Sequence, residues 1–543
     1  MTIFEKAERR PLIALALLAF LMFVPGLFTL PPVDRDEARF AQASRQMVET
    51  GNLVDIRFQG EPRHKKPVGI YWLQASFAKI LGKDHIWPYR LPSFFGAIAA
   101  VLLTFWAGRP LVGARAALIG AALLAATLLL NVEARLAKTD AVLLATVVAS
   151  MGVLARAWTG ETITLRLALV FWGALGLGIL VKGPIAPMVV ALTVVALGLT
   201  SVRWAYLKSL RPLLGLGVLA VLVAPWVIAV SIATHGEFFM TAIAGDLAPK
   251  LAGGQESHGA PPGTYLALLL VTFWPGVIFL GPAFVEAYQG RKSPNAAFLM
   301  FWALPTWLVF EFIPTKLPHY VLPVYPALAL MCGAWIAART TEFRKVPLIG
   351  WGALLNFVVV AVALGVAMML VRPISEGTRS IFDAAGTLTL FLVTAATARA
   401  LVQKKILHVV QGAALAAFVA MVGAFGIVLP SLTSPFISPR IAALVPRDSE
   451  GGMRPVIASG YSEPSLVFLT HTDTRFVQPA EAAAILKAEP RTVAAIAATA
   501  DGDFQAAVQA DGLKLAPLGT VQGFNYSVGK PVTVTLFERA DAQ

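Results

Sequence analysis

Long apolar runs recur from near the N-terminus to about residue 430 of this 543-residue chain, and no other feature constrains the fold as strongly. Each run holds about 18 to 22 residues, which as an α-helix is long enough to cross roughly 30 Å of hydrocarbon. The composition agrees, since 57% of the residues are hydrophobic and only 14% are charged. An ordinary soluble globular protein is therefore excluded, and we predict an all-α polytopic membrane bundle.

The positions of the runs predict about thirteen membrane-spanning helices. The first run follows Lys6, Arg9 and Arg10 as in a signal peptide, but no small-x-small cleavage site comes after it, so we expect a retained anchor. The predicted spans cover approximately residues 12–30, 88–108, 113–131, 140–155, 167–181, 184–200, 212–233, 264–285, 296–313, 320–338, 347–371, 381–398 and 407–429.

The distribution of basic residues predicts the orientation of these spans. With a cytoplasmic N-terminus, every second loop carries at least two Lys or Arg residues, such as Arg109 and Arg115, as the positive-inside rule requires. The net charge of +13 is thus scattered over loops and forms no basic stripe, so we expect no nucleic-acid partner. We predict a multi-pass protein of a bacterial inner membrane, with residues 31–87, 234–263 and the tail from about residue 435 in the periplasm.

A change of composition near residue 434 predicts two domains, a membrane domain over 1–434 and a small α/β periplasmic domain over 435–543. In the tail, RPVIASG, SLVFLT, TRFVQ and KPVTVTLFER have the composition of strands, while AEAAAILKAE and DFQAAVQADG have that of short helices. The tail contains no catalytic motif that we recognise, so its role stays open.

Two acids open the first outside loop. Asp36 and Glu37 begin a segment whose apolar residues have helical spacing, which predicts an amphipathic helix lying at the membrane surface. These acids are candidate catalytic residues, held where a substrate can reach them. The alternative is structural, with Asp34 or Asp36 capping the helix and Glu37 favouring its positive end.

A cluster of cations follows in the same loop. Arg63, Lys65 and Lys66 lie beside His64 and before an amphipathic stretch at 68–81, so they could clamp a phosphate. Attraction to anionic lipid headgroups would explain the same cations.

Further candidates lie at short outside junctions between spans. Asp140 begins a membrane helix after Lys138, and Lys182 stands between two closely spaced spans. Asp140 could converge on one site with Asp36, and Lys182 is an ionisable residue at membrane depth, which suggests a functional role. The structural alternatives are that Asp140 caps its helix and that Lys182 snorkels. Lys316 and Tyr320 offer further phosphate contacts, with His319 beside them as a residue more typical of packing than of ligation.

The evidence for a metal site is weak. Loop 234–263 contains His235, Glu237, Asp246, Glu256 and His258, but without the spacing of a tight site. The single cysteine, Cys332, excludes an intrachain disulfide and a thiolate cluster. We predict neither a metal nor another cofactor.

In order along the chain, DEARFAQASRQM, HKKPVGIYWLQA, ARLAKTDAVLL, VKGP and KLPHYVLPVYP resemble the GT-C glycosyltransferases, specifically the family of aminoarabinose transferases that modify lipid A, and more distantly the protein mannosyltransferases. The resemblance implies a GT-C bundle with interfacial periplasmic helices, with Asp36 and Asp140 as its two loop acids. It also implies that Lys66, Lys182 and Tyr320 line the cavity for the donor phosphate. The chain departs from the family at Lys65, where an acid is expected, and at Asp246, which lacks a following His.

The expected reaction is transfer of a sugar from a polyprenyl-phosphate donor to an outside acceptor. Lipid A or core sugar is the first candidate, followed by another envelope glycan, a glycolipid or a protein. Arg63, Lys65, Lys66 and Lys182 would stabilise the leaving phosphate, and Asp36 would act on the acceptor. A lipid transporter or flippase is the competing class, but transporters place ionisable residues near the bilayer midplane. Asp36, Lys65, Lys66 and Asp140 are instead predicted at the outer surface, which favours an enzyme.

Overall fold

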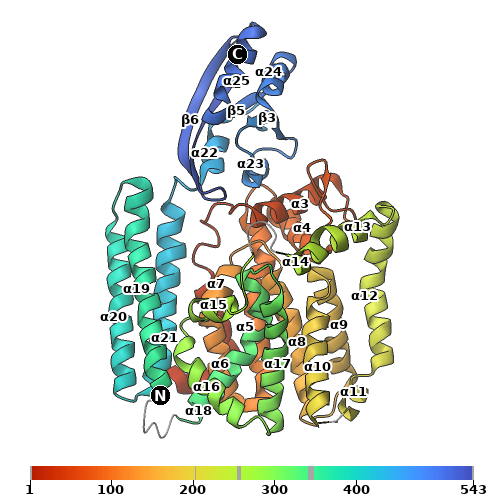
Figure 1. Ribbon diagram of the computed structural model, residues 1–543, viewed down its shortest axis with the longest axis vertical. Helices are drawn as coiled ribbons and strands as arrows, with labels where there is room; N and C mark the ends of the chain where they lie inside the picture. Colours follow the sequence, from red (N-terminus) through yellow and green to blue (C-terminus); the bar gives the residue numbers. More distant parts are fainter. Residues whose placement is uncertain (1–2, 202–203, 254–258, 340–347, 450, 541–543) are drawn as a thin grey trace.

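A computed structural model describes residues 3–201, 204–253, 259–339, 348–449 and 451–540. Long helices run side by side through a bundle, and most of the shorter helices and all the strands lie at one of its ends, which we term the loop end (Figure 1). The chain starts at the other end, which agrees with the predicted side of the loops relative to the N-terminus.

The bundle helices are α1 (Ile3–Arg9), α2 (Pro11–Phe23), α5 (Trp87–Val112), α6 (Ala114–Ala126), α7 (Leu128–Glu133), α8 (Asp140–Trp158), α9 (Leu165–Lys182), α10 (Ile185–Ser201), α11 (Ala205–Ser209), α12 (Pro212–Ala233), α15 (Thr264–Thr272), α16 (Val277–Gln289), α17 (Pro294–Phe312), the 3-10 helix η2 (Pro318–Val324), α18 (Tyr325–Ala337), α19 (Leu348–Glu376), α20 (Ile381–Val402), α21 (Ile406–Met421), the π-helix η3 (Val422–Val428) and η4 (Leu429–Ser431).

The predicted membrane bundle is confirmed. Among the described residues, 9 helical stretches are long and apolar enough to span a membrane, and the first of these comprises both α5 and α6. Three shorter apolar helices, α2, α10 and α16, account for the remaining predicted spans. The predicted span 264–285 is divided into α15 and α16, since Pro275 lies between them and cannot donate a backbone hydrogen bond.

Small residues let the central helices approach one another closely. A Cβ on Gly152 of α8 would lie 3.1 Å from that of Ala107 in α5 and would collide with the Trp106 ring, and a Cβ on Gly96 would lie 2.9 Å from the backbone of Val142. Such contacts provide the van der Waals packing that holds helices together within a membrane. They fix the first residue of α8, Asp140, close to the loop end of α5.

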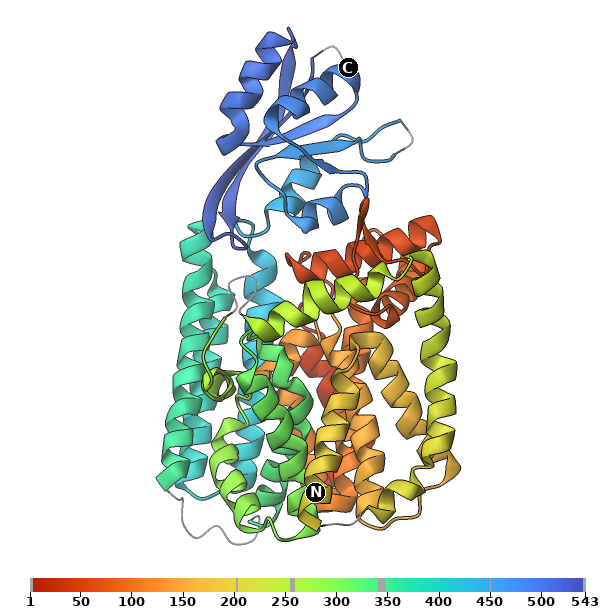
Figure 2. The ribbon, with the colours of Figure 1, turned by 45° about the vertical axis from the view of Figure 1, so that its right-hand side comes forward.

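Two amphipathic helices cover the loop end, as the sequence predicts. They are α3 (Asp36–Thr50) and α4 (Gly69–Leu81), and a short hairpin of β1 (Arg57–Phe58) and β2 (Glu61–Pro62) lies between them. A second segment crosses the helix ends beside α3 (Figure 2). It consists of α13 (Glu237–Met240), the π-helix η1 (Thr241–Leu247) and α14 (Ala248–Ala252).

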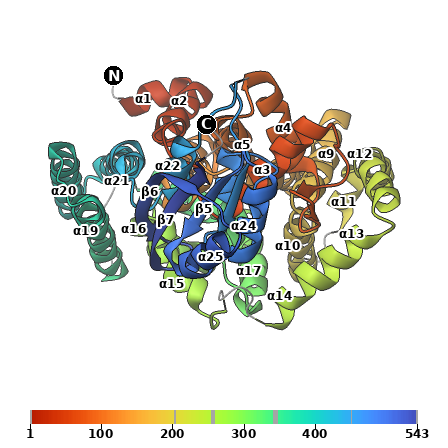
Figure 3. The ribbon, with the colours of Figure 1, turned by 90° about the horizontal axis from the view of Figure 1, so that it is seen from above.

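The C-terminal residues form the predicted small α/β domain, which lies over the middle of the bundle between α19 and α20 at one edge and α12 at the other (Figure 3). Its sheet has the order β4-β3-β5-β7-β6, with β3 parallel to β4 and β5, and β7 antiparallel to β5 and β6. Both faces of the sheet are covered, so β5 is buried throughout. The elements are α22 (Ile437–Leu444), β3 (Val456–Ser459), α23 (Pro464–Leu469), β4 (Arg475–Phe476), α24 (Pro479–Ala488), β5 (Val493–Ala497), α25 (Ala498–Ala510), β6 (Leu515–Asn525) and β7 (Lys530–Arg539).

One predicted strand of this domain is wrong. SLVFLT forms most of helix α23, which begins at Pro464. Proline is well suited to the first turn of a helix, because its missing N–H would have no partner there. The apolar composition that suggested a strand instead provides side chains that are buried on several sides of a short helix.

Candidate functional site

A cavity of about 380 Å³ opens at the loop end of the bundle. Its walls come from the start of α3, the 63–67 turn, the start of α8, the α9–α10 junction, the α13–η1 segment and the α17–η2 connection. Of the predicted site residues, it collects Asp36, Arg63, Lys65, Lys66, Asp140, Lys182 and Tyr320. Segments far apart in the sequence therefore contribute acids and cations to one space.

Asp140 and Lys182 form an ion pair in this cavity. The Lys182 ammonium, at the last residue of α9, donates to Oδ1 of Asp140, the first residue of α8. Each charge is favoured by its helix dipole, because the acid is at an N-terminus and the cation at a C-terminus. Lys182 also lies 5.5 Å from the centre of the Tyr320 ring. The contacts of Asp140 with cations, rather than with the amides of its own helix, favour a role in the site over simple capping.

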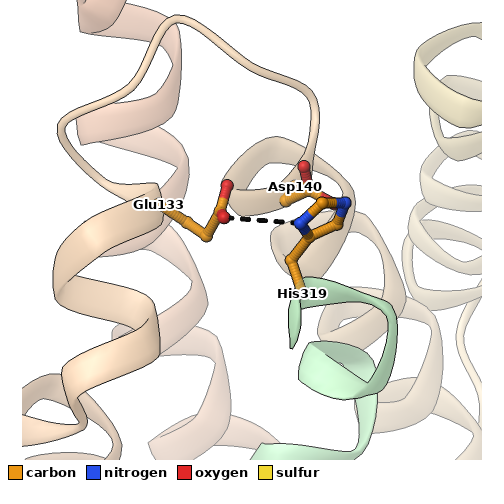
Figure 4. Close-up of side chains that lie close together, drawn as sticks. All are labelled: Glu133, Asp140 and His319. Carbon is orange, nitrogen blue, oxygen red and sulfur yellow. Dashed lines mark ion pairs between the residues drawn. The ribbon is translucent and has the colours of Figure 1, made fainter. Parts of the chain in front are cut away.

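A second layer of charge lies behind this pair. The Lys138 ammonium is 3.1 Å from Oε1 of Glu133 and 3.9 Å from Oδ2 of Asp140. His319 points between the two carboxylates, with Nδ1 3.7 Å from Glu133 and Nε2 3.9 Å from Asp140 (Figure 4). Burial opposes the charge of Lys138, but Glu133, Asp140 and Asp36 raise its pKa above its ordinary value. Lys138 is therefore a cation that electrostatically links both loop acids.

The donor atoms of Glu133, Asp140 and His319 lie within 4.8 Å of one another, so these residues could hold a metal ion. Lysine ammoniums already contact both carboxylates, however. A divalent cation placed there would meet two positive charges in a poorly screened environment. The donor set thus fits an internally neutralised cluster better than a metal site, and metal independence stays a prediction.

The predicted phosphate-binding cations line another wall. Arg63, Lys65 and Lys66 all border the cavity, and the Arg63 guanidinium lies 5.1 Å from the centre of the Phe40 ring. The neighbouring His64 does not line the cavity, since it is buried in a 2.8 Å contact with Asp55. Three cations from one turn, with Lys138 and Lys182 across the cavity, make it strongly positive.

The cavity also has an apolar wall. It is formed by Phe238, Phe239, Ala242 and Ile243, which belong to the segment that crosses the helix ends. The sequence identified this segment only as part of loop 234–263, and no spacing indicated that its aromatic residues reach the cavity. Of the metal ligands considered in the same loop, Glu256 and His258 and the side chain of Asp246 lie outside the described residues.

Asp36 differs from Asp140 in its surroundings. It is the first residue of α3 and is exposed at the edge of the cavity, near Lys138. Arg39 and Phe40, one turn later, line the same cavity. A carboxylate at this position is accessible to a molecule arriving from the loop end.

The structure contradicts a catalytic role for Glu37. Its side chain points away from the cavity and is 2% exposed, in an ion pair with buried Arg90. It also accepts hydrogen bonds from the backbone N–H groups of Val33 and Ala137. Glu37 therefore ties the loop that carries Asp36 to the turn that precedes Asp140, which is a positioning function.

Lys316 is also displaced from its predicted role. Its ammonium donates to the backbone carbonyls of Phe310, Glu311 and Ile313, at the C-terminal end of α17. These carbonyls lack partners within the helix, so a lysine is well suited to cap them. The structure places Lys316 outside the cavity lining, as a helix cap rather than a phosphate ligand.

Sequence reasoning missed Glu133 altogether and treated His319 only as a packing residue. One signal was available for Glu133, because an acid at the last residue of an apolar helix is opposed by the helix dipole. For His319, the sequence offered no sign that it would lie between two carboxylates.

Comparisons with known proteins agree with this fold. Residues 65–228 match the family described as dolichyl-phosphate-mannose-protein mannosyltransferase. ArnT from Cupriavidus metallidurans, solved with bound undecaprenyl phosphate, has a similar fold, with a TM-score of 0.74 over 98% of each chain and 20% identity. The archaeal oligosaccharyltransferase AglB from Archaeoglobus fulgidus is more distant, with a TM-score of 0.53 over 87% of this chain and 64% of that one. The fold and the charged cavity define a GT-C membrane glycosyltransferase.

A curated relative gives the family. The undecaprenyl phosphate-α-4-amino-4-deoxy-L-arabinose arabinosyl transferase of Pseudomonas paraeruginosa is 30% identical over 386 residues, covering 68% of each chain. The chain belongs to this transferase family, which confirms the resemblance seen in its motifs and sets aside the transporter alternative.

Proposed function

We propose that this protein transfers a sugar from a polyprenyl phosphate to an acceptor at the periplasmic face of the inner membrane. The observation that carries the proposal is the cavity itself, whose lining combines Asp36 with a group of cations and with phenylalanines. The cations match a phosphate, and the apolar wall matches a prenyl chain. The names of the relatives, which act with undecaprenyl phosphate, support the same donor class.

In the proposed reaction, an oxygen of the acceptor attacks the anomeric carbon while the bond from this carbon to the phosphate oxygen breaks. The polyprenyl phosphate leaves with the bonding electrons, and Lys65, Lys66, Arg63 and Lys182 stabilise its growing negative charge. Asp36 accepts the proton of a hydroxyl acceptor, or orients an acceptor that is already an ionised phosphate. Asp140 holds Lys182 and Lys138 in place by neutralising them.

The acceptor we propose is lipid A or its core sugar, ahead of another envelope glycan or glycolipid. Purified protein in detergent should move labelled sugar from a polyprenyl-phospho-sugar to an extract of envelope lipids. Mass spectrometry of envelope lipids from a deletion strain and its complemented counterpart should show one sugar-sized mass that only the complemented strain contains. If detergent-purified protein releases no polyprenyl phosphate with any acceptor fraction, the proposal is wrong.

We also propose a periplasmic location for the cavity and for residues 435–543. Single cysteines introduced at Asn52 and Ala510 should react with a membrane-impermeant thiol reagent in intact spheroplasts. The parent chain is a suitable control, because its single cysteine, Cys332, is buried. Labelling only after lysis would reverse the orientation and remove the reason for a lipid-carried donor.

A further inference from the structure

The C-terminal domain contacts the membrane domain through α3, the helix that carries Asp36. Helix α3 presents two opposite faces, because successive residues of an α-helix turn by about 100°. Asp36, Arg39 and Phe40 face the cavity. The side chains of Gln42, Arg45 and Glu49 lie on the other side. All three form hydrogen bonds with residues of the C-terminal domain.

Phe468 of α23 is the apolar centre of this contact. It is 0% exposed and belongs to one buried apolar cluster with Ala41 of α3, Ala78 of α4, Tyr89 of α5 and Ala137 of the turn before Asp140. Its ring meets that of Tyr89 edge to face, with centroids 5.4 Å apart. One buried cluster thus joins the C-terminal domain to the elements that carry both loop acids.

Polar contacts surround Phe468 and continue to the residues just before Asp36. The Asp34 carboxylate accepts hydrogen bonds from the backbone N–H and the hydroxyl of Ser465, at 2.8 and 2.7 Å. The Arg45 guanidinium donates to the Phe468 carbonyl at 2.6 Å. The Gln42 amide donates to the Thr472 hydroxyl at 2.8 Å.

We propose that the C-terminal domain is a positioning element of the transferase, in which Ser465 and Phe468 hold the loop of Asp36 in register with the loop of Asp140. The proposal rests on the proposed function and adds the role that the tail sequence left open. Its physical basis is that, among the described residues, α23 and the turn after it contact the side of α3 that is turned away from the cavity, so the C-terminal domain supplies the contacts of that side. Glu37 links the same two loops from below, through the Ala137 amide.

The test compares two buried phenylalanines in the full-length protein. Phe468→Leu and Phe468→Ala should lower kcat by about tenfold and about 100-fold, since small displacements of reacting groups are costly. The KM for the donor should change by less than about threefold, because the donor cations lie on other segments. Phe504 is equally buried but lies in the core of the C-terminal domain against Phe537, so Phe504→Leu should leave kcat unchanged.

A second measurement separates positioning from folding. In Phe468→Ala, hydrogen exchange should accelerate in residues 36–50 and 134–139 while the sheet of the C-terminal domain stays protected. Cysteines replacing Gln42 and Thr472, joined by a short bis-maleimide, should restore at least half of the lost kcat in Phe468→Ala. Wild-type kcat in Phe468→Ala, or no rescue by the cross-link, would overturn the positioning role. Absence of sugar transfer by the wild-type protein would instead refute the proposed function, and the exchange measurement would still report on the contact.

Discussion

The two loop acids illustrate different uses of one functional group. Asp140 is 3% exposed and is contacted by the ammoniums of Lys182 and Lys138. Asp36 is exposed at the edge of the same cavity. A buried carboxylate needs permanent partners to offset its lost hydration, whereas an exposed one can exchange its partners. The difference suggests that Asp140 organises the cations and that Asp36 meets the acceptor.

The sharpest test of this division is Asp36→Asn, which keeps the size of the side chain but removes its negative charge. We expect kcat to fall by about 10²- to 10⁴-fold, the range associated with a lost general base. The apparent Tm should stay unchanged, because the side chain is exposed. Initial rates with saturating donor and thermal unfolding in the same detergent provide the two measurements. Wild-type turnover in this variant would show that Asp36 does not act on the acceptor, and the proposed difference between Asp36 and Asp140 would be wrong.

Asp140→Asn should lower the rate less than Asp36→Asn does, but it should lower the stability of the protein more. Two ammoniums would lose their buried counter-charge, so we expect kcat to fall by about 10²-fold together with a lower apparent Tm. Lys182→Met added to Asp140→Asn should recover part of the Tm but none of the activity. Loss of activity at an unchanged Tm would mean that Asp140, like Asp36, acts directly on a substrate.

The sequence was informative about this site where a charge was out of place for its surroundings. Lys182 stands between two closely spaced spans, Asp140 opens a membrane helix and Asp36 opens an amphipathic helix, so each could be predicted. Glu37 and Lys316 have similar residue types and spacing, but whether a charged side chain points into a cavity or binds a nearby backbone group depends on packing. The sequence could not determine that difference for Glu37 or for Lys316.

The fold could be predicted from the sequence to about the same extent as the site. Hydropathy locates the apolar helices, because each one must cross the hydrocarbon of the membrane and satisfy its own backbone hydrogen bonds there. It cannot reveal that Phe468, in the C-terminal domain, is buried against residues more than 300 positions earlier in the chain, such as Tyr89. Contacts of that kind depend on how the surfaces of the membrane domain and the C-terminal domain fit together.

The cation wall offers a further test of the division between the acids. Lys65→Glu introduces the acid that the family resemblance leads us to expect at this position and should lower kcat/KM by about tenfold to 100-fold. Lys65→Arg should retain most activity, because it keeps the charge. An increase in activity with Lys65→Glu on addition of a divalent ion would show that this wall can be converted to metal-assisted binding of the phosphate.

Chelation should have almost no effect if lysines neutralise the buried acids. Turnover of purified protein should be the same within about twofold with and without excess EDTA, since Lys138 and Lys182 already pair with Glu133 and Asp140. Complete loss that one divalent ion reverses would make Glu133, Asp140 and His319 its first candidate ligands. Asp140 would then resemble a metal ligand more than an organiser of lysines.

The smallest predicted effect concerns Asp34, the acid that contacts the C-terminal domain. Burial raises its pKa from 3.8 to about 7, with a contribution from Glu463, while hydrogen bonds from Ser465 and the charge of Arg39 act in the opposite direction. The folded protein therefore binds this proton more tightly than the unfolded chain does. The contribution of Asp34 to stability is greatest below about pH 4, falls as the pH rises to about 7, and is constant above that value.

Asp34→Asn stays neutral at every pH, and its amide can still bond to Ser465. The apparent Tm of the variant minus that of the wild type should therefore rise by about 2 to 4 °C between about pH 4 and pH 7 and stay level above pH 7. Other titrating groups are common to both proteins and cancel in this difference. A difference that does not vary with pH would show that Asp34 is already ionised across this range. Its bonds to Ser465 would then be charge-assisted throughout, and Asp34→Asn should instead lower the Tm at every pH, because neutral hydrogen bonds are weaker.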